Sequence, residues 1–208
     1  GWIASRDGRT DAGPWLWAGT MAALEAVQAE DGTLLMRFPH EVLNAYSITE
    51  TTLDDVVSIS VPTSYSSQVL TPPLPECCRI SADLSWQEGT REISLLLTDA
   101  EGENGYMFRL EPGQNRAVLD RWPRRTPGVE QWHVAGDIPH FIELERPTDL
   151  SAGRVHIDVL IRDELLQCCV DGAVMLSTSV YDHPSGRVGV SALDGAVTLH
   201  SLTTYSRS

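Results

Sequence analysis

The sequence contains no lysine, and it has little positive charge. All 15 basic residues are arginines, against 29 aspartates and glutamates, so the formal net charge is −14. An acidic surface repels the phosphate backbone of nucleic acids, which excludes nucleic acid as an expected partner. Long apolar runs are also missing, since no stretch reaches the ~18 apolar residues that a membrane-spanning helix requires. We therefore expect no membrane partner either.

Cysteine is scarce, and its spacing is unusual. The four cysteines form two adjacent pairs, Cys77-Cys78 and Cys168-Cys169. The Cys-x2-Cys spacing of a zinc ribbon is absent. We interpret the cysteines as free thiols that act as small hydrophobic residues, with one disulfide between the pairs as the alternative if their strands are neighbours. Free thiols are typical of a reducing compartment and favour a cytoplasmic location.

The patterns of several catalytic classes are missing as well. There is no Gly-x-Ser-x-Gly turn for a nucleophilic serine and no glycine-rich loop for a phosphate. The six histidines are scattered, and no two have the one-turn spacing that places both rings on one helix face. The sequence therefore predicts no catalytic residue, no metal site and no cofactor in this chain.

What the sequence does contain is alternation of period two. Apolar residues occupy every second position from Val155 to Ile161, which predicts a half-buried strand. Three further segments read as successive antiparallel strands: residues 91–100, 105–113 and 117–122. Many short strands separated by Gly, Pro, Asn and Asp indicate a β-sandwich or barrel.

Turn residues predict where these strands end. Asp171-Gly172 and Asp194-Gly195 each stand between apolar runs, and we expect a hairpin turn at both. The polar, proline-rich stretch Thr63–Cys78 predicts a connection that crosses a surface or joins two sheets.

One segment conflicts with an all-β reading. Residues 20–32 contain a threonine cap candidate, alanine-rich helix formers and a glycine at the position that often follows a helix. Taken alone, this segment predicts a helix.

The tryptophans near the N-terminus are the stronger functional clue. Trp15 and Trp17 are separated by one residue, so on a strand they share a face. Buried tryptophans fill cores, whereas exposed ones stack on the faces of sugars. Both interpretations stay open from the residues alone.

The order of these motifs resembles the C-terminal part of glycoside hydrolase family 32, the β-fructofuranosidases, inulinases and levanases. Gly1-Trp2, Trp17-Ala18-Gly19-Thr20-Met21 and Asp31-Gly32-Thr33-Leu34 are similar to the end of its catalytic propeller. Residues 105–122 and 154–206 resemble its closing β-sandwich. Ala18 and the Ala22-Ala23-Leu24-Glu25 stretch depart from the family pattern, so we expect a divergent member whose substrate need not be sucrose.

The resemblance implies a fold and a division of the chain. It implies an all-β fold, a two-sheet antiparallel β-sandwich of the concanavalin-like jelly-roll type preceded by remnant strands of a five-bladed β-propeller. Residues 1–45 would be the last strands of a truncated catalytic propeller, and residues 46–208 the sandwich domain. It also places a strand, not a helix, at residues 20–28. Most of the propeller would precede Gly1.

The family's catalytic motifs are not matched. The sequence contains no Asp-Pro dipeptide, so the motifs that carry the nucleophile and the transition-state stabiliser are absent. Glu76-Cys77 matches the acid/base motif in letters, but it follows the Gly-Trp strand instead of preceding it. Retaining glycoside hydrolysis needs two carboxylates held about 5 Å apart. We therefore expect the isolated chain not to be an enzyme, although the resemblance implies that its parent is a retaining β-fructosidase-like glycosidase.

The resemblance also implies partners and contacts. The expected partner is the N-terminal propeller of the same parent chain, with fructose-containing oligosaccharides as ligands. The loop from Ser5 to Trp17 would lie near the rim of the parent's active site, where Asp7, Arg9, Trp15 and Trp17 are the candidate sugar contacts.

Two alternative functions stay open. A lectin-like carbohydrate-binding sandwich would need aromatic residues exposed on one sheet, and the candidates are Trp86, Trp122 and Trp132. An assembly domain would instead form homodimers through an exposed sheet edge.

Overall fold

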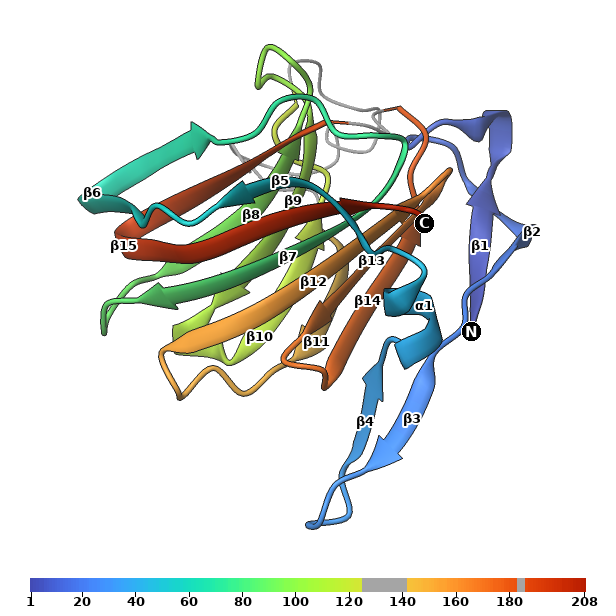
Figure 1. The fold of residues 1–208 in the computed structure, drawn as a ribbon, viewed down its shortest axis with the longest axis horizontal. Coiled ribbons are helices and arrows are strands. Elements are labelled where there is room, and N and C mark those ends of the chain that lie inside the picture. Colours follow the sequence, from blue (N-terminus) through green and yellow to red (C-terminus); the bar gives the residue numbers. More distant parts are fainter. Residues whose placement is uncertain (125–141, 183–185) are drawn as a thin grey trace.

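The computed structural model describes residues 1–124, 142–182 and 186–208, and almost all of its regular structure is antiparallel β (Figure 1). Its elements follow in chain order as β1 (Trp2–Arg6), β2 (Trp15–Met21), β3 (Glu25–Gln28), β4 (Leu34–Arg37), α1 (His40–Asn44), β5 (Ile48–Leu53), β6 (Val57–Val69), β7 (Cys77–Trp86), β8 (Glu92–Thr98), β9 (Gly105–Glu111), β10 (Arg116–Asp120), β11 (Ile142–Pro147), β12 (Arg154–Arg162), β13 (Leu165–Val170), β14 (Val174–Ser179) and β15 (Arg187–Ser206). Among the described residues, no helix has both the length and the apolarity to cross a membrane.

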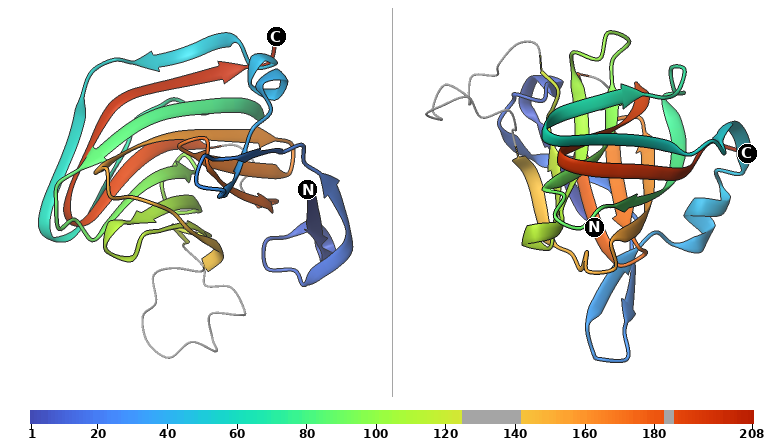
Figure 2. Two further views of the ribbon diagram at one scale, coloured as in Figure 1. Left: turned by 90° about the horizontal axis from the view of Figure 1, so that it is seen from below. Right: turned by 90° about the vertical axis from the view of Figure 1, so that its left-hand side faces the viewer.

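The long strand β15 joins two layers of a sandwich. Its residues 187–193 pair with β8, and beyond β8 the first layer continues through β9 and β10 to β11. Its residues 197–206 pair with β7, and the second layer continues through β12 and β13 to β14. Strands β5 and β6 add to the other edge of β15. Figure 2 shows the two layers lying over one another, which confirms the expected all-β sandwich.

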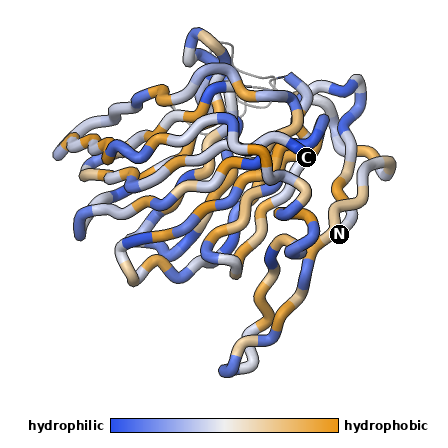
Figure 3. The backbone as a smooth tube through the Cα atoms, viewed as in Figure 1, coloured by the Kyte–Doolittle hydropathy of each residue, from blue (hydrophilic) through white to orange (hydrophobic). Residues whose placement is uncertain are grey.

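The core lies between these layers and is built by alternation. In β12 the residues Val155, Ile157, Val159 and Ile161 are all buried, as the period of two predicts. They belong to one apolar cluster with side chains of β8 and β9 in the opposite layer. Figure 3 shows the apolar positions recurring along these strands. Each fully buried aliphatic side chain of this kind contributes about 1.5–3 kcal/mol to folding.

Only one of the two Asp-Gly pairs forms the hairpin turn that the sequence predicts. Asp171 and Gly172 both have positive φ and close a tight turn between β13 and β14, so this predicted hairpin is confirmed. The hairpin predicted at Asp194-Gly195 is wrong, because β15 runs straight through it. Asp194 has a positive φ of 48°, and the register with β6 shifts there, so the pair forms a bulge where β15 passes between the layers. A Cβ on Gly195 would lie 2.4 Å from the Thr90 hydroxyl, which requires glycine.

Strand pairing decides the structure of two further segments, the proline-rich connection and residues 20–28. The connection expected from Thr63 begins later, because β6 continues to pair with β15 as far as Val69. The segment with strong helix formers is extended: β2 pairs with β1, and β3 pairs with β4. Strand pairing therefore overrides the helix propensity of residues 20–28.

The first 45 residues form two small hairpins beside the sandwich (Figure 1). The chain after β4 packs on the outer face of β12–β14. There Phe38 and Tyr46 form a second apolar cluster together with Leu160, Cys169 and Met175. The hairpin β1–β2 is different, because every residue of β2 is exposed.

Candidate functional site

The β1–β2 hairpin carries the four predicted sugar contacts, two in its loop and two in its second strand. Asp7 and Arg9 belong to a short 3-10 turn, and Trp15 and Trp17 belong to β2. The Asp7 backbone N–H donates to the Pro14 carbonyl at 2.9 Å, which closes the loop on itself. Trp17 is 96% exposed, whereas Arg9 turns toward the sandwich and pairs with Glu164. That these residues touch a sugar stays a prediction.

Trp15 is half-exposed, and a cation occupies one side of its ring. The guanidinium carbon of Arg6 lies 3.7 Å from the centroid of the Trp15 ring. Arg6 is itself buried and donates a hydrogen bond from Nη1 to the Gly13 carbonyl at 2.9 Å. A cation over an indole face is favourable, and it leaves one ring face of Trp15 for any other ligand.

A buried aspartate anchors this loop to the sandwich. Asp11 is only 4% exposed. Its Oδ2 accepts a hydrogen bond from the Tyr106 hydroxyl at 2.5 Å, and its Oδ1 accepts one from the Tyr181 backbone N–H at 2.8 Å. Arg121 donates to its carbonyl oxygen. Burial raises the pKa of Asp11, and the Tyr106 and Tyr181 hydrogen bonds oppose that rise. Sequence reasoning missed Asp11, because a lone aspartate in a polar loop gives no signal of burial.

A pocket of about 460 Å³ lies where this loop and hairpin face the β12–β13 turn. Arg9, Glu164 and Tyr181 line it, and the Arg9 guanidinium carbon is 5.9 Å from the centroid of the Tyr181 ring. Its acidic residues are the neighbours Asp163 and Glu164, and Glu164 is already paired with Arg9. This arrangement can hold a polar ligand, but it does not present two free facing carboxylates.

The exposed face of the second layer carries a histidine between two carboxylates. His156 Nδ1 lies 2.8 Å from Asp83 Oδ1, and His156 Nε2 lies 3.2 Å from Asp158 Oδ2 and 3.3 Å from Ser81 Oγ. Serine, histidine and aspartate side chains are thus adjacent, as in a hydrolase triad. The hydrogen bond to Asp158 and then that to Asp83 raise the pKa of His156 to about 9. A ring that is protonated at neutral pH cannot serve as a general base.

The first layer carries a buried ionic cluster on the face opposite its core. Arg109 is 3% exposed, and its Nε donates to Asp120 Oδ2 at 2.8 Å. Its Nη1 pairs with Glu111, which also accepts a hydrogen bond from Arg116 Nε at 2.7 Å. These are structural ion pairs, in which each buried charge has an opposite partner.

The cysteines are free, as the sequence predicts. Cys78 lies on β7 and Cys168 on β13, and β12 stands between those strands. The disulfide alternative is therefore wrong. Glu76 is exposed in the connection before β7. Among the described residues, no group of three histidine, cysteine or acidic side chains is arranged to hold a metal ion.

The two aromatic candidates for a binding sheet that the structure describes, Trp86 and Trp122, lie in different layers. Trp86 is half-buried at the end of β7 and packs against the main core. Trp122 is half-buried after β10. Trp132 lies outside the described residues. Trp86 and Trp122 therefore do not form a shared aromatic platform for a sugar.

Comparison with known proteins supports the fold. No family model and no curated sequence matches the chain. The structure of the carbohydrate-binding module CBM66 from Bacillus subtilis matches with a TM-score of 0.57 at 11% identity, over 69% of this chain and 83% of the module. Exo-inulinase from Aspergillus awamori matches with a TM-score of 0.58 at 12% identity, over 92% of this chain and 36% of the enzyme.

A third match extends along nearly the whole chain. Fructosyltransferase from A. japonicus matches with a TM-score of 0.56 at 11% identity, over 99% of this chain and 34% of that protein. The chain thus spans about a third of the length of these two enzymes. The resemblance expected from the sequence motifs is confirmed at the level of the fold: this chain folds like a part of the exo-inulinase and of the fructosyltransferase, and like the carbohydrate-binding module.

Proposed function

We propose that this chain is the non-catalytic β-sandwich module of a family 32-type glycoside hydrolase and that it supports a propeller carrying the active site. Residues 1–45 would complete the last strands of that propeller, and residues 46–208 would form the supporting sandwich. The observation that carries the proposal is the state of the β1–β2 hairpin. The hairpin has only two strands, β1 lies against the sandwich, and the apolar strand β2 is exposed along its whole length.

The large apolar side chains of this hairpin are unusually exposed for the surface of a complete folded protein. Trp17 is 96% exposed, Met21 74%, Trp2 57% and Trp15 50%. A two-stranded hairpin is marginally stable in water, and three or more strands are needed for independent stability. Contiguous exposed apolar side chains mark a surface that another element covers. The outer edge of β2 also presents unpaired backbone groups among the described strands.

The covering element that fits is further strands of a propeller blade. A strand pairing with β2 would satisfy its free edge, and an adjoining sheet would bury the tryptophans. The fold matches to longer fructan enzymes support this reading, since the chain corresponds to about a third of each. In the assembled protein, Asp7 and Arg9 would lie near the rim of the sugar cleft, and fructose-containing oligosaccharides are the ligands to test.

Association with the preceding segment of the gene product tests the proposal. The segment encoded before Gly1 is produced separately, mixed with this chain and analysed by size-exclusion chromatography and by fructose release from sucrose and inulin. We expect a stable complex that releases fructose, with no release by this chain alone. Replacing Trp17 and Met21 by serine should abolish the complex.

A matched control uses exposed residues elsewhere. Tyr65 and Val69 on β6 are 42% and 41% exposed, and their replacement by serine should leave the complex intact. Failure of the two segments to associate, or equal loss of the complex with both double variants, would contradict the proposal.

The homodimer alternative stays a prediction that light scattering tests. A measured mass of one chain at every concentration would exclude it.

A further inference from the structure

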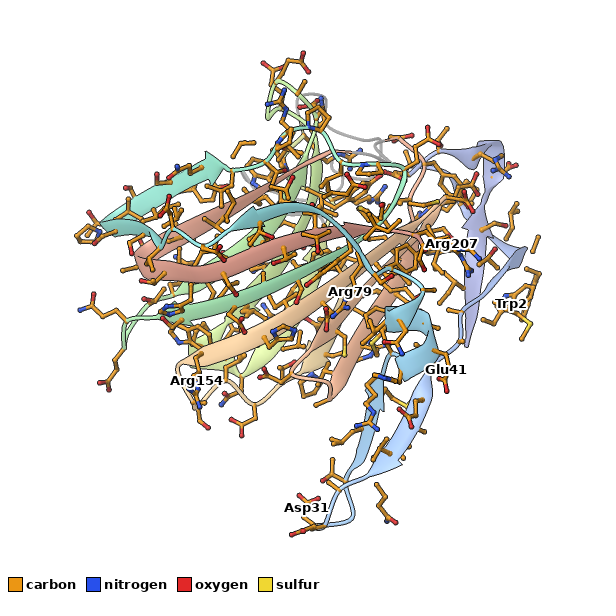
Figure 4. All side chains as sticks on the ribbon, in the orientation of Figure 1. Trp2, Asp31, Glu41, Arg79, Arg154 and Arg207 are labelled. Carbon is orange, nitrogen blue, oxygen red and sulfur yellow. The ribbon has the colours of Figure 1, made fainter. Side chains whose placement is uncertain are left out.

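A second hollow lies at the other end of the sandwich from the β1–β2 hairpin. It has a volume of about 790 Å³ and is formed by three loops, at residues 86–91, 112–114 and 150–153. These loops adjoin the start of β12, where Figure 4 labels Arg154, and the hairpin with Trp2 lies on the opposite side of the picture. A domain docked on the hairpin would therefore leave this loop pocket open.

Hydrogen bonds between the loops hold the walls of the loop pocket in place. The Trp86 backbone N–H donates to the Gly153 carbonyl at 3.0 Å, which ties the first loop to the third. The Leu150 N–H donates to the Asn115 side chain at 3.3 Å, which ties the third loop to the end of the second. Thr90 is buried and exchanges two hydrogen bonds with the Ala196 backbone. The pocket is thus formed before any ligand arrives.

The lining combines one aromatic ring with polar side chains. The Trp86 side chain is partly buried against the apolar core, and its exposed part lines the pocket. Glu88, Arg91 and Gln114 are exposed residues of the same lining. The Arg91 guanidinium lies 3.5 Å from Glu92 through Nε and 3.4 Å from Asp194 through Nη1, and the side chain is 65% exposed, so its outer part can still donate to a ligand. A ring face with a few polar groups around it suits a ligand that has an apolar face and hydroxyl edges.

The charges around the loop pocket disfavour an anionic ligand. Glu88 lines it, and Glu92 and Asp194 both lie beside Arg91. Carboxylates therefore outnumber the single guanidinium. A phosphorylated or carboxylated ligand would meet this negative field, whereas a neutral polyol would not.

We propose that the loop pocket binds a neutral saccharide unit, stacked on Trp86 and hydrogen-bonded by Glu88, Arg91 and Gln114. The carboxylate of Glu88 accepts hydrogen bonds from ring hydroxyls, while Arg91 and the Gln114 amide donate to hydroxyl oxygens. This binding is separate from the packing role proposed above, because it uses the opposite end of the molecule and needs no second domain.

Isothermal titration calorimetry of the full 208-residue chain tests the proposal. The probes are glucose, galactose, mannose, fructose, sucrose and inulin, with glucose 6-phosphate as the anionic comparison. We expect saturable binding of at least one neutral saccharide and weaker binding of the phosphate. Trp86→Leu should weaken binding by at least about tenfold, and Gln114→Ala, a surface change that leaves the core untouched, by about three- to tenfold.

Trp2→Leu is the matched control, because it removes an equally large, exposed ring at the far end that is not a candidate sugar contact, and it should leave the affinity unchanged. The proposal is overturned if no neutral saccharide binds, or if binding is the same in the Gln114→Ala variant as in the parent chain. Since neither outcome depends on the hairpin, a failure here is distinguishable from a failure of association with a propeller.

Discussion

The Tyr106 hydroxyl donates a hydrogen bond of 2.5 Å to the Asp11 carboxylate, and this contact joins the N-terminal loop to the centre of the sandwich. Both side chains are buried, and they are 95 residues apart in the chain. The contact fixes the loop that presents Arg9 and leads into β2. Whatever docks on the hairpin is therefore positioned by the sandwich.

Removing this hydrogen bond should loosen the loop. Tyr106→Phe leaves a buried carboxylate without one of its donors, and we expect a loss of about 1–3 kcal/mol in the free energy of unfolding. Urea denaturation measures it. Tyr65→Phe removes a hydroxyl from an exposed ring and should change the stability by less than about 0.5 kcal/mol. Equal effects of the two variants would contradict the anchoring role of Asp11.

His156 predicts a loss of stability at alkaline pH. The pKa of His156 is raised from 6.5 to about 9 in the folded chain. A raised pKa means that the folded state binds the proton more tightly, so the stabilisation is complete below pH 6.5 and is lost as the pH rises through about 9. Because the ring is 41% exposed, solvent screening reduces the effect to about 1 kcal/mol. Unfolding free energies measured from pH 6 to 10 should show this decline, and His156→Gln should flatten it. A decline of equal size in the variant would assign the effect to another group.

The buried ionic cluster predicts a large penalty for removing its centre. Arg109→Leu removes the guanidinium that pairs with both Asp120 and Glu111, so these buried carboxylates lose part of their compensating charge, and we expect a loss of about 3–5 kcal/mol. Arg154→Leu is the control, since Arg154 is exposed. Thermal unfolding of the two variants separates them. A loss below about 1 kcal/mol for Arg109→Leu would show that the cluster is not a stabilising unit.

The thiols should differ sharply in reactivity. Burial raises the pKa of Cys78 to about 12 and that of Cys169 to about 11, and it raises the pKa of Cys168 as well. The thiolate is the reactive form, so these three should resist a thiol reagent at neutral pH. We expect one fast reaction in the native chain, at half-buried Cys77, and four after denaturation. Four fast reactions in the native chain would contradict this burial.

Local patterns in the sequence predicted the sandwich well where neighbouring residues decide the structure. Alternation from Val155 to Ile161 predicted a strand with one buried face. Asp171-Gly172 predicted a turn because both residues adopt positive φ. The same residue pair at Asp194-Gly195 led to a wrong prediction of a hairpin, because a positive φ also occurs in a β-bulge. Only the pairing of β15 with both layers distinguishes a bulge from a hairpin turn here.

The site was harder to predict, because its contacts join distant parts of the chain. Asp11 is anchored by Tyr106 and Tyr181, and Trp86 is enclosed by loops 26 and 64 residues further along. A charged residue such as Arg109 is solvated on most strands, and its burial follows from partners on other strands. Neither composition nor periodicity contains that information.

Hydrogen exchange of strand β2 tests the central claim most directly. Amide exchange of residues 15–21 is compared between this chain and the same chain joined to the segment that precedes Gly1 in its gene. We predict fast exchange on the unpaired edge of β2 in the chain alone and strong protection in the longer protein, with no change in β12. Equal exchange of β2 in both forms would contradict the claim that this hairpin completes a preceding propeller.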